Sequence, residues 1–352
     1  MTIIVFLVVL GLVVFVHEFG HFLVAKLSGV KVEEFAFGFP PRIFSFRRGE
    51  TRYSINLIPF GGYVRMLGEE RTSSDPRSFS SQGPLRRLAI VLAGVVMNFL
   101  LAILFLWVGY LVGMAPLTLD AQTLSGKKTT RVAVVEVLPD SPAQKVGIRP
   151  GDFILGFPST TDFQKFTKTH QGERVTLAIL RGRKKISLSP QLSAKPEGPL
   201  GVTIINWTLV QLSPGKALIA AIKDTYGFAK MVLVFLGRFV SQLFQGKLAK
   251  EVAGPVGIYQ ITGQAVKLGP VYVIQWIAIL SINLGLINAV PFPALDGGRA
   301  LFVVVEALFR RKIVRAELEN ALHILGFALL LMLVAAVTYR EVTNLVINRW
   351  SS

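Results

Sequence analysis

The sequence contains no cysteine, and this absence restricts the chemistry open to it. A chain without cysteine forms no disulfides and offers no thiolate to a metal ion. Any zinc site in it must therefore be built from histidine and carboxylate side chains. Histidine is scarce as well, with 4 in 352 residues. Histidines that fall close together are therefore the residues to examine for a metal site.

Charged side chains are also sparse, and acidic ones are the rarer kind. Charged residues make up 17% of the chain and hydrophobic residues 52%, whereas soluble domains contain about 25% charged residues. Lys and Arg number 38 and Asp and Glu 21, which gives a net charge of +17. In a membrane protein, such basic residues set the topology and contact anionic lipid headgroups. We expect membrane lipids as partners and no nucleic acid, because no nucleic-acid-binding motif is present.

Charge is rarest in four long apolar stretches. A helix needs about 20 apolar residues to cross a bilayer, and the candidates are Thr2–Ala25, Leu88–Gly113, Val271–Val290 and Ile324–Val337 with its flanks. The first is not typical of a cleaved signal peptide, because it lacks a basic n-region and a small-residue cleavage site. We therefore predict a polytopic α-helical membrane protein with about four transmembrane helices.

Basic residues in the short loops predict the orientation of these spans. Residues 26–87 contain 11 Lys and Arg, and the loop between the third and fourth spans is basic too. The positive-inside rule places both loops in the cytoplasm and both termini outside it. The predicted organisation is a first span (1–27), a cytoplasmic loop with a membrane-associated β-hairpin (28–87), a second span (88–114), an extracytoplasmic domain (115–206), a membrane-surface helix with a linker (207–270), a third span with a broken loop (271–298), a cytoplasmic loop (299–323), and a fourth span with the C-terminus (324–352).

The extracytoplasmic segment has the pattern of a small α+β domain. Arg131–Leu138 alternates like a strand, SPAQKVGIRPGD (Ser141–Asp152) indicates a short helix and a turn, and Thr161–His170 indicates a second helix. This pattern resembles a PDZ domain, a fold that binds peptides by adding a strand to a sheet edge. Gly198–Ile205 is the candidate strand beside the groove for a peptide C-terminus. A rigid spacer without a ligand is the alternative.

The next segment, Ser213–Leu248, is apolar at helical spacing but carries basic residues along its whole length. This pattern predicts an amphipathic helix on the outer membrane surface. A fifth span is the alternative.

The first loop is rich in aromatic and β-branched residues. Glu33–Leu67 predicts two or three strands of a small sheet, with turns at Pro40-Pro41 and at 48–50. Within it, IPFGGYV (Ile58–Val64) is more apolar than an ordinary cytoplasmic loop. Its paired glycines predict close approach to another backbone.

The first span contains HEFGH, an H-E-x-x-H motif. His17 and His21 are four residues apart, so both imidazoles lie on one face of a helix and can bind one Zn²⁺. Glu18 is placed to act on a water molecule beside the metal. Each ionisable group at the centre of a bilayer costs about 2.5–3.5 kcal/mol on insertion scales. Three such groups within five residues therefore indicate a function.

A catalytic zinc usually takes three protein ligands, so a third is needed. The best carboxylate is Asp296, in the proline-broken sequence NAVPFPALDGGR at the end of the third span. Broken helices are tolerated in membranes where they line a cavity, which suits a metal site. Asp296 acting only as a helix N-cap is the alternative. His170 and His323 are interpreted as surface or interface residues.

These motifs together resemble the site-2 protease family. The resemblance rests on HEFGH in the first span, PFGGYV in the following loop, GVVMN in the second span, and GPVGI, SINLGLIN and NAVPFPALDGG around the third. It covers nearly the whole chain and is strongest to the regulator-of-sigma-E branch of bacterial intramembrane proteases. Two features depart from that branch. Val95 stands where the second-span motif often has proline, and one PDZ domain is expected where well-known Gram-negative members have two.

The resemblance implies a zinc endopeptidase of the bacterial cytoplasmic (inner) membrane, with its active site toward the cytoplasmic side. His17, His21 and Asp296 would bind one Zn²⁺ per chain, and Glu18 would be the general base. Asn98, from GVVMN, would hold the scissile peptide or its oxyanion. Bonding to a neighbouring helix is the alternative for Asn98, as for any polar residue in a span.

The resemblance also implies how substrates bind. The substrates would be single-pass membrane proteins, such as an anti-sigma factor or remnant signal peptides, and the PDZ domain would filter their access. The implied substrate-binding residues are Phe60, Gly61, Gly62 and Tyr63 of the loop sheet, and Asn288, Pro291 and Pro293 of the broken loop.

Two other classes of function are compatible with parts of the sequence. One is a catalytically inactive membrane scaffold that gathers partners through its PDZ domain, against which the intact Glu18 argues. The other is a metal transporter, because intramembrane His and Asp also mark ion pathways. A transporter favours ligands spread over several spans, and the second span and the apolar core of the fourth contain no His, Asp or Glu.

Overall fold

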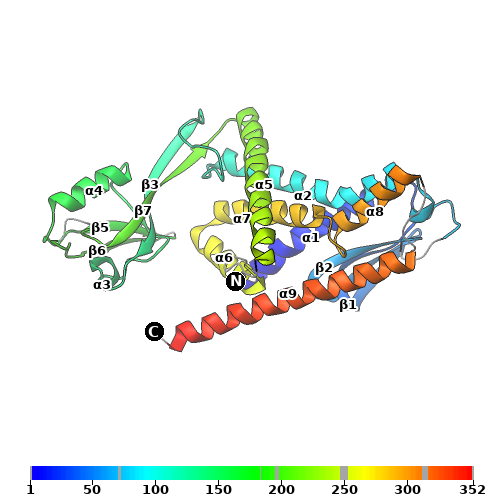
Figure 1. The fold of residues 1–352 in the computed structure, drawn as a ribbon. Helices are drawn as coiled ribbons and strands as arrows, with labels where there is room; N and C mark the ends of the chain where they lie inside the picture. Colours follow the sequence, from blue (N-terminus) through cyan, green and yellow to red (C-terminus); the bar gives the residue numbers. More distant parts are fainter. Residues whose placement is uncertain are drawn as a thin grey trace. The chain divides into compact units, whose positions relative to one another are not determined.

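The structure is a computed structural model and describes residues 2–69, 73–182, 184–194, 198–245, 253–310 and 316–350. The chain divides into two compact units (Figure 1). The first unit comprises Met1–Phe105, Thr225–Gly263 and Trp276–Ser352, and the second comprises Leu106–Asp224 and Gln264–Gln275.

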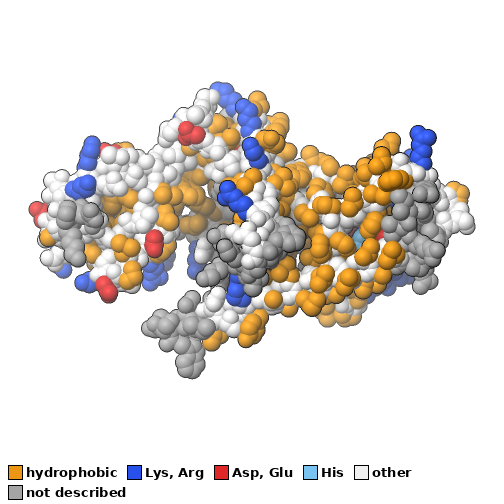
Figure 2. All heavy atoms as spheres, viewed as in Figure 1, with side chains coloured by type: hydrophobic (Ala, Val, Ile, Leu, Met, Phe, Trp, Pro, Cys, Tyr) orange, Lys and Arg blue, Asp and Glu red, His pale blue; other side chains and the backbone are white. Residues whose placement is uncertain are grey.

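Four helices of the described chain are long and apolar enough to cross a membrane: α1 (Thr2–Leu27), α2 (Pro84–Val112), α7 (Pro270–Ala289) and the Ala321–Asn344 part of α9 (Ala316–Trp350). They match the four apolar stretches of the sequence. Figure 2 shows hydrophobic side chains over the exposed surface of α9. Exposed apolar surface of this kind suits contact with lipid.

The remaining long helix, α5 (Pro214–Phe244), is not among the described helices that are apolar enough to cross a membrane. Lys216, Lys223, Lys230 and Arg238 interrupt its apolar sequence. A position on the membrane surface stays a prediction. Two shorter helices complete this part of the chain, α6 (Pro255–Leu268) and α8 (Asp296–Phe309).

The sheet of the first unit is formed by two long antiparallel strands, β1 (Val32–Arg48) and β2 (Thr51–Met66). Both bend back on themselves, so residues 34–37 pair with 52–55 on one side and with 62–65 on the other. The expected two or three strands therefore become four strand segments. Gly62–Met66 forms one edge, with no strand partner on its outer side among the described residues.

This sheet is fixed against α1 and α2 by apolar packing. Val32 and Phe35 of β1 and Val64 and Met66 of β2 are buried in one cluster with Ile90 of α2. Burial contributes about 25 cal/mol per Å² of apolar surface removed from water. The packing holds the edge segment of β2 beside the helix that carries HEFGH.

The second unit contains a five-stranded antiparallel sheet in the order β6-β5-β4-β3-β7. Its strands are β3 (Lys127–Val137), β4 (Phe153–Ile154), β5 (Leu177–Arg181), β6 (Lys184–Leu188) and β7 (Val202–Gln211), and its helices are α3 (Pro142–Lys145) and α4 (Thr160–Thr169).

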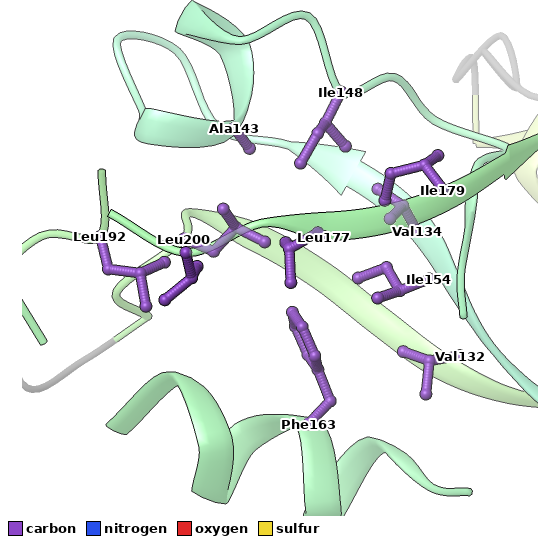
Figure 3. Packing of buried hydrophobic residues seen from close by; sticks show 11 residues of the cluster. Val132, Val134, Ala143, Ile148, Ile154, Phe163, Leu177, Ile179, Leu192 and Leu200 are labelled. Carbon is purple, nitrogen blue, oxygen red and sulfur yellow. The ribbon is translucent and has the colours of Figure 1, made fainter. Parts of the chain in front are cut away.

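The core of this sheet is apolar and closed by α4. Phe163 of α4 is buried against side chains from the strands, including Leu177 and Ile154 (Figure 3). Ser159 caps α4, because its side chain accepts a hydrogen bond from the backbone N–H of Asp162. The helices α3 and α4 and the strands β3 and β7 overlap the segments in which the sequence pattern indicates two helices and two strands.

Candidate metal centre

The HEFGH motif lies within α1, and its two histidines are buried. His17 is 5% exposed and His21 8% exposed, one helical turn apart. Their Nε2 atoms face each other at 3.2 Å. A helix brings residues four apart onto one face, so this pairing follows directly from the spacing.

The third member of the group comes from the break after α7. The backbone turns sharply between Ala289 and α8, and a Cβ added to Gly297 would lie 2.3 Å from the carbonyl oxygen of Val290. Only glycine therefore fits there. The turn brings Asp296, the first residue of α8, to the histidines: its Oδ2 is 3.0 Å from His17 Nε2 and 3.2 Å from His21 Nε2.

The three atoms have the spacing that a zinc ion requires. Tetrahedral Zn²⁺ with bonds of about 2.0–2.1 Å separates neighbouring ligand atoms by about 3.3 Å. Here the separations are 3.0, 3.2 and 3.2 Å. Asp296 Oδ2 is buried and accepts no hydrogen bond. A buried carboxylate needs a compensating partner, and a bound cation would provide it. Within the described residues, this is the one group of three such ligands.

A backbone carbonyl fixes the protonation of one histidine. His21 Nδ1 lies 2.8 Å from the carbonyl oxygen of Ile90. A carbonyl only accepts, so Nδ1 carries the hydrogen and donates it. The Nε2 lone pair is therefore free to point at the metal position, as in most histidine ligands.

The other histidine is held by the amide of Asn98, which is fully buried. Asn98 Nδ2 lies 3.1 Å from His17 Nδ1, and Asn98 Oδ1 is buried without a hydrogen-bond partner. The amide oxygen and nitrogen have nearly the same shape and can be exchanged in assignment, which places Oδ1 beside His17 Nδ1. Oδ1 then accepts from His17 Nδ1–H, and Nε2 is left as a ligand atom.

Gly94 of α2 provides the room for both imidazoles. A Cβ at this position would lie 2.4 Å from His21 Nε2 and 2.7 Å from His17 Cε1. Even alanine would therefore displace the rings. The sequence places Gly94 at the start of GVVMN but gives no sign that it faces the histidines.

A cavity of about 620 Å³ opens beside this group. Glu18, His21 and Asp296 line one part of it, and the edge segment of β2 from Gly62 to Met66 lines another. The edge runs close to the glutamate: a Cβ on Gly62 would lie 3.1 Å from Glu18 Cγ. The predicted base and the predicted binding strand therefore share one cavity.

The loop-sheet residues of the prediction divide in two. Gly62 and Tyr63 line the cavity, whereas Gly61 lies at the bend of β2 with φ +110°, a value that favours glycine. A Cβ on Gly61 would also lie 2.5 Å from the ring of Phe39. Phe60 belongs to β2, and its side chain lies outside what the structure describes.

The residues predicted in the broken loop also occupy different places. Asn288 Nδ2 is 3.5 Å from His17 Nε2, which puts it next to the metal position. Pro291 is exposed, and a Cβ on Gly326 of α9 would lie 2.4 Å from the carbonyl oxygen of Pro293. Pro293 therefore packs against a helix, and neither proline is among the described residues that line the cavity.

The two remaining histidines lie apart from the metal group. His170 ends α4 in the second unit, where its Nδ1–H donates to the carbonyl oxygen of Phe166. His323, interpreted as a surface or interface residue, is partly buried and contacts the broken loop. Its side chain is only 14% exposed, and its Nδ1 accepts a hydrogen bond from the backbone N–H of Ala294 at 2.9 Å. An isolated histidine in a helix carries no sequence signal of such a contact.

Comparison with known proteins agrees with this geometry. The sequence matches Peptidase family M50 over residues 5–333. The chain belongs to this family, the site-2 proteases. The zinc metalloprotease RasP of Oceanobacillus iheyensis is 31% identical over 438 residues, covering 98% of this chain and 99% of the relative. RasP of Geobacillus kaustophilus is 29% identical over 429 residues, covering 97% of each protein. A protein of Clostridium acetobutylicum is 36% identical over 356 residues, covering 97% of each.

This M50 protein is a zinc metalloprotease and a multi-pass membrane protein. The predictions of its family, its enzyme class and its Zn²⁺ cofactor are confirmed. The residues that hold the zinc and perform the hydrolysis remain to be assigned from the geometry.

Proposed function

We propose that this M50 protease is an intramembrane endopeptidase that cuts single-pass membrane proteins within their transmembrane segments. The observation that carries the proposal is one cavity in which His21, Asp296 and Glu18 face an unpaired strand edge. This cavity lies among helices that are long and apolar enough to cross a membrane.

His17, His21 and Asp296 hold the zinc, and Glu18 is the general base. Bound zinc supplies Lewis acidity toward a peptide carbonyl and lowers the pKa of water. Glu18 follows His17 in the chain, lines the cavity and is no member of the ligand group. Its carboxylate takes a proton from water and returns it to the leaving nitrogen.

Asn98 orients His17 and does not bind substrate. Its complete burial and its distance of 3.1 Å from His17 Nδ1 support this role over the oxyanion role that the family resemblance implies. Hydrogen bonds of this kind fix the ring orientation and the tautomer of histidine ligands. Asn288, next to His17 Nε2, is the better placed of the two amides to contact a substrate carbonyl.

The edge segment Gly62–Met66 binds the substrate as an added strand. A helical substrate hides its carbonyl groups in internal hydrogen bonds, so it must unwind before it can be cut. In lipid, each lost backbone hydrogen bond needs a new partner. A strand edge beside Glu18 supplies these partners where the peptide bond is cut. Phe60 and Gly61 lie at the bend that presents this edge, and Tyr63 lies within the edge.

The enzyme lies in the bacterial inner membrane with both termini outside the cytoplasm and the cavity toward the cytoplasmic side. The 11 basic residues of 26–87 support this orientation. Anti-sigma factors and remnant signal peptides are the substrates that the family resemblance implies.

The second unit acts as a PDZ domain that filters substrates. Its strand β7 lies at the sheet edge, and the neighbouring α4 is tied to it by a hydrogen bond from Thr160 N–H to Asn206 Oδ1 at 2.8 Å. The turn at Gly198–Gly201 precedes β7, the strand beside which a peptide C-terminus would bind. The filter acts by binding such a terminus or by steric obstruction.

The test compares purified wild-type protein with Glu18→Gln on a tagged single-span substrate, with zinc content measured on the same samples. We expect cleavage by wild type only and about one zinc in both. A wild type that binds zinc but cleaves no helical substrate would favour the scaffold. Transport of the metal ion into liposomes without cleavage would favour the transporter. The described residues contain no second ligand group along which an ion could pass.

A further inference from the structure

The broken loop between α7 and α8 needs hydrogen-bond partners for its backbone. Pro291 and Pro293 have no N–H group. Phe292 N–H donates to the carbonyl oxygen of Val290 at 2.7 Å, and Leu295 N–H donates to Phe292 at 3.1 Å. Ala294 N–H instead donates to a side chain from another helix, Nδ1 of His323 in α9, at 2.9 Å. A backbone donor at membrane depth needs such a partner.

Ala294 also has an unusual backbone conformation. Its φ is +81°, in the left-handed region that residues with a Cβ rarely adopt. Such conformations persist where the surroundings determine them. The hydrogen bond that Ala294 N–H donates to His323 is a contact that holds this residue, and Asp296 follows only two positions later.

The histidine is itself held in place. Its ring lies edge-on to Phe302 of α8, with centroids 5.9 Å apart. One turn further along α9, Gly326 contacts the backbone of Pro293 so closely that an added Cβ would lie 2.4 Å from its carbonyl oxygen. Phe327, the next residue, lines the catalytic cavity. The helix α9 is therefore docked on the loop at the point where the loop leads to Asp296.

We propose that His323 is a positioning residue for Asp296. By accepting from Ala294 N–H it fixes the left-handed turn, and through that turn it sets the place of the third zinc ligand. Retention of zinc then depends on α9 being docked against the loop. This inference rests on the proposed ligand role of Asp296, and it assigns a function to a histidine outside the H-E-x-x-H motif.

The test uses the full-length protein in detergent and measures zinc affinity by competition with a chelator, together with kcat and KM. His323→Leu removes the acceptor and should weaken zinc binding on the order of tenfold and lower kcat. His323→Asn keeps an acceptor near the position of Nδ1 and should stay within about threefold of wild type. Leu331→Ala, at an exposed position of α9, controls for a side-chain change elsewhere on this helix.

A double variant separates positioning from packing. Glycine adopts φ +81° without strain, so Ala294→Gly added to His323→Leu should recover most of the lost zinc affinity. Equal zinc affinity in wild type and His323→Leu would overturn the proposal, as would an equal loss in the Leu and Asn variants. If the Leu variant does not fold, His323→Gln takes its place, because its acceptor reaches the Nε2 position and should weaken zinc binding. Failure of the wild type to bind zinc or cleave would count against the proposed function instead.

Discussion

The side-chain amide of Asn98 lies 3.1 Å from Nδ1 of His17, on the opposite edge of the imidazole from Asp296. This contact joins α2 to the helix that carries the zinc motif. Asn98, a polar residue in an apolar span, thereby orients the proposed metal ligand His17. The same logic applies to the carbonyl oxygen of Ile90, which accepts from His21 Nδ1–H. Both histidines are thus oriented by one helix.

Replacing Asn98 by leucine should lower zinc affinity about 10- to 100-fold, the usual cost of losing such a contact. Asn98→Asp should keep the affinity, because a carboxylate also accepts from His17 Nδ1–H. Chelator competition measures both. Asn283→Leu is the matched control, since the Asn283 amide donates within its own helix α7, to the carbonyl oxygen of Ile279. Full zinc affinity in Asn98→Leu would remove the orienting role.

Replacing Gly94 by alanine should abolish zinc binding and cleavage together. The added Cβ would stand 2.4 Å from His21 Nε2, well inside the contact distance of real atoms. Metal analysis of the purified variant gives the result. Gly237→Ala in α5 is the control, because a Cβ there meets no atom within 4 Å. Zinc at wild-type content in Gly94→Ala would mean that α2 moves aside.

Substituting Gly61 and Gly62 together by proline should abolish cleavage and leave zinc bound. Proline removes the backbone donors of the edge and cannot adopt the φ of +110° at Gly61. The three zinc ligands lie on other elements. Cleavage of a single-span substrate and zinc content, measured side by side, decide the matter. Cleavage near the wild-type rate would refute substrate binding at this edge.

The sequence identified the parts of this site that are local, and the fold supplied the rest. His17 and His21 could be predicted because a helix brings positions i and i+4 together. Asp296 could be predicted because a proline-broken helix in a membrane is tolerated where it lines a cavity, and Asp296 is the carboxylate of that segment. Gly94 and His323 could not, because their importance comes from what packs against them across the fold. The bent strands were missed in part for the same reason, since their second pairing joins residues distant in sequence.

Glu341 of α9 should stabilise the start of α6. Its carboxylate accepts from the backbone N–H groups of Gly254 at 2.7 Å and of Val256 and Gly257 at 3.2 Å. An anion at a helix N-terminus contributes up to about 2 kcal/mol where partly buried. We therefore expect Glu341→Leu to lower the Tm in detergent and Glu341→Gln, which keeps an acceptor, to lower it less.

The same contact explains the glycines of GPVGI. A Cβ on Gly254 or Gly257 would lie 2.8 or 2.6 Å from the Glu341 carboxylate oxygens. Gly254→Ala should therefore lower the Tm as Glu341→Leu does, and the double variant should lower it little further. Additive effects would show that the two residues act separately.

Glu34 should make the stability of the loop sheet depend on pH. This carboxyl is 4% exposed, accepts from Ser54 Oγ–H and pairs with Arg42 at 2.7 Å. Burial alone would raise its pKa, but the hydrogen bond from Ser54 and the charge of Arg42 hold the pKa below its usual value. A lowered folded-state pKa means that the ionised form stabilises the fold above the ordinary glutamate pKa of about 4.3. That stability is lost as the pH falls through the folded-state value.

Glu34→Gln should accordingly lower the free energy of unfolding at pH 7 by about 1–2 kcal/mol, and with it the Tm. The gap between the variant and wild type should narrow as the pH falls below the ordinary glutamate pKa of about 4.3 and through the lowered folded-state pKa, where the carboxyl becomes protonated. Thermal unfolding in detergent across pH 3–8 measures the gap, with Glu33→Gln as the control because Glu33 is the half-buried neighbour on the same strand. A gap that stays constant with pH would mean that Glu34 acts through its shape and not through its charge.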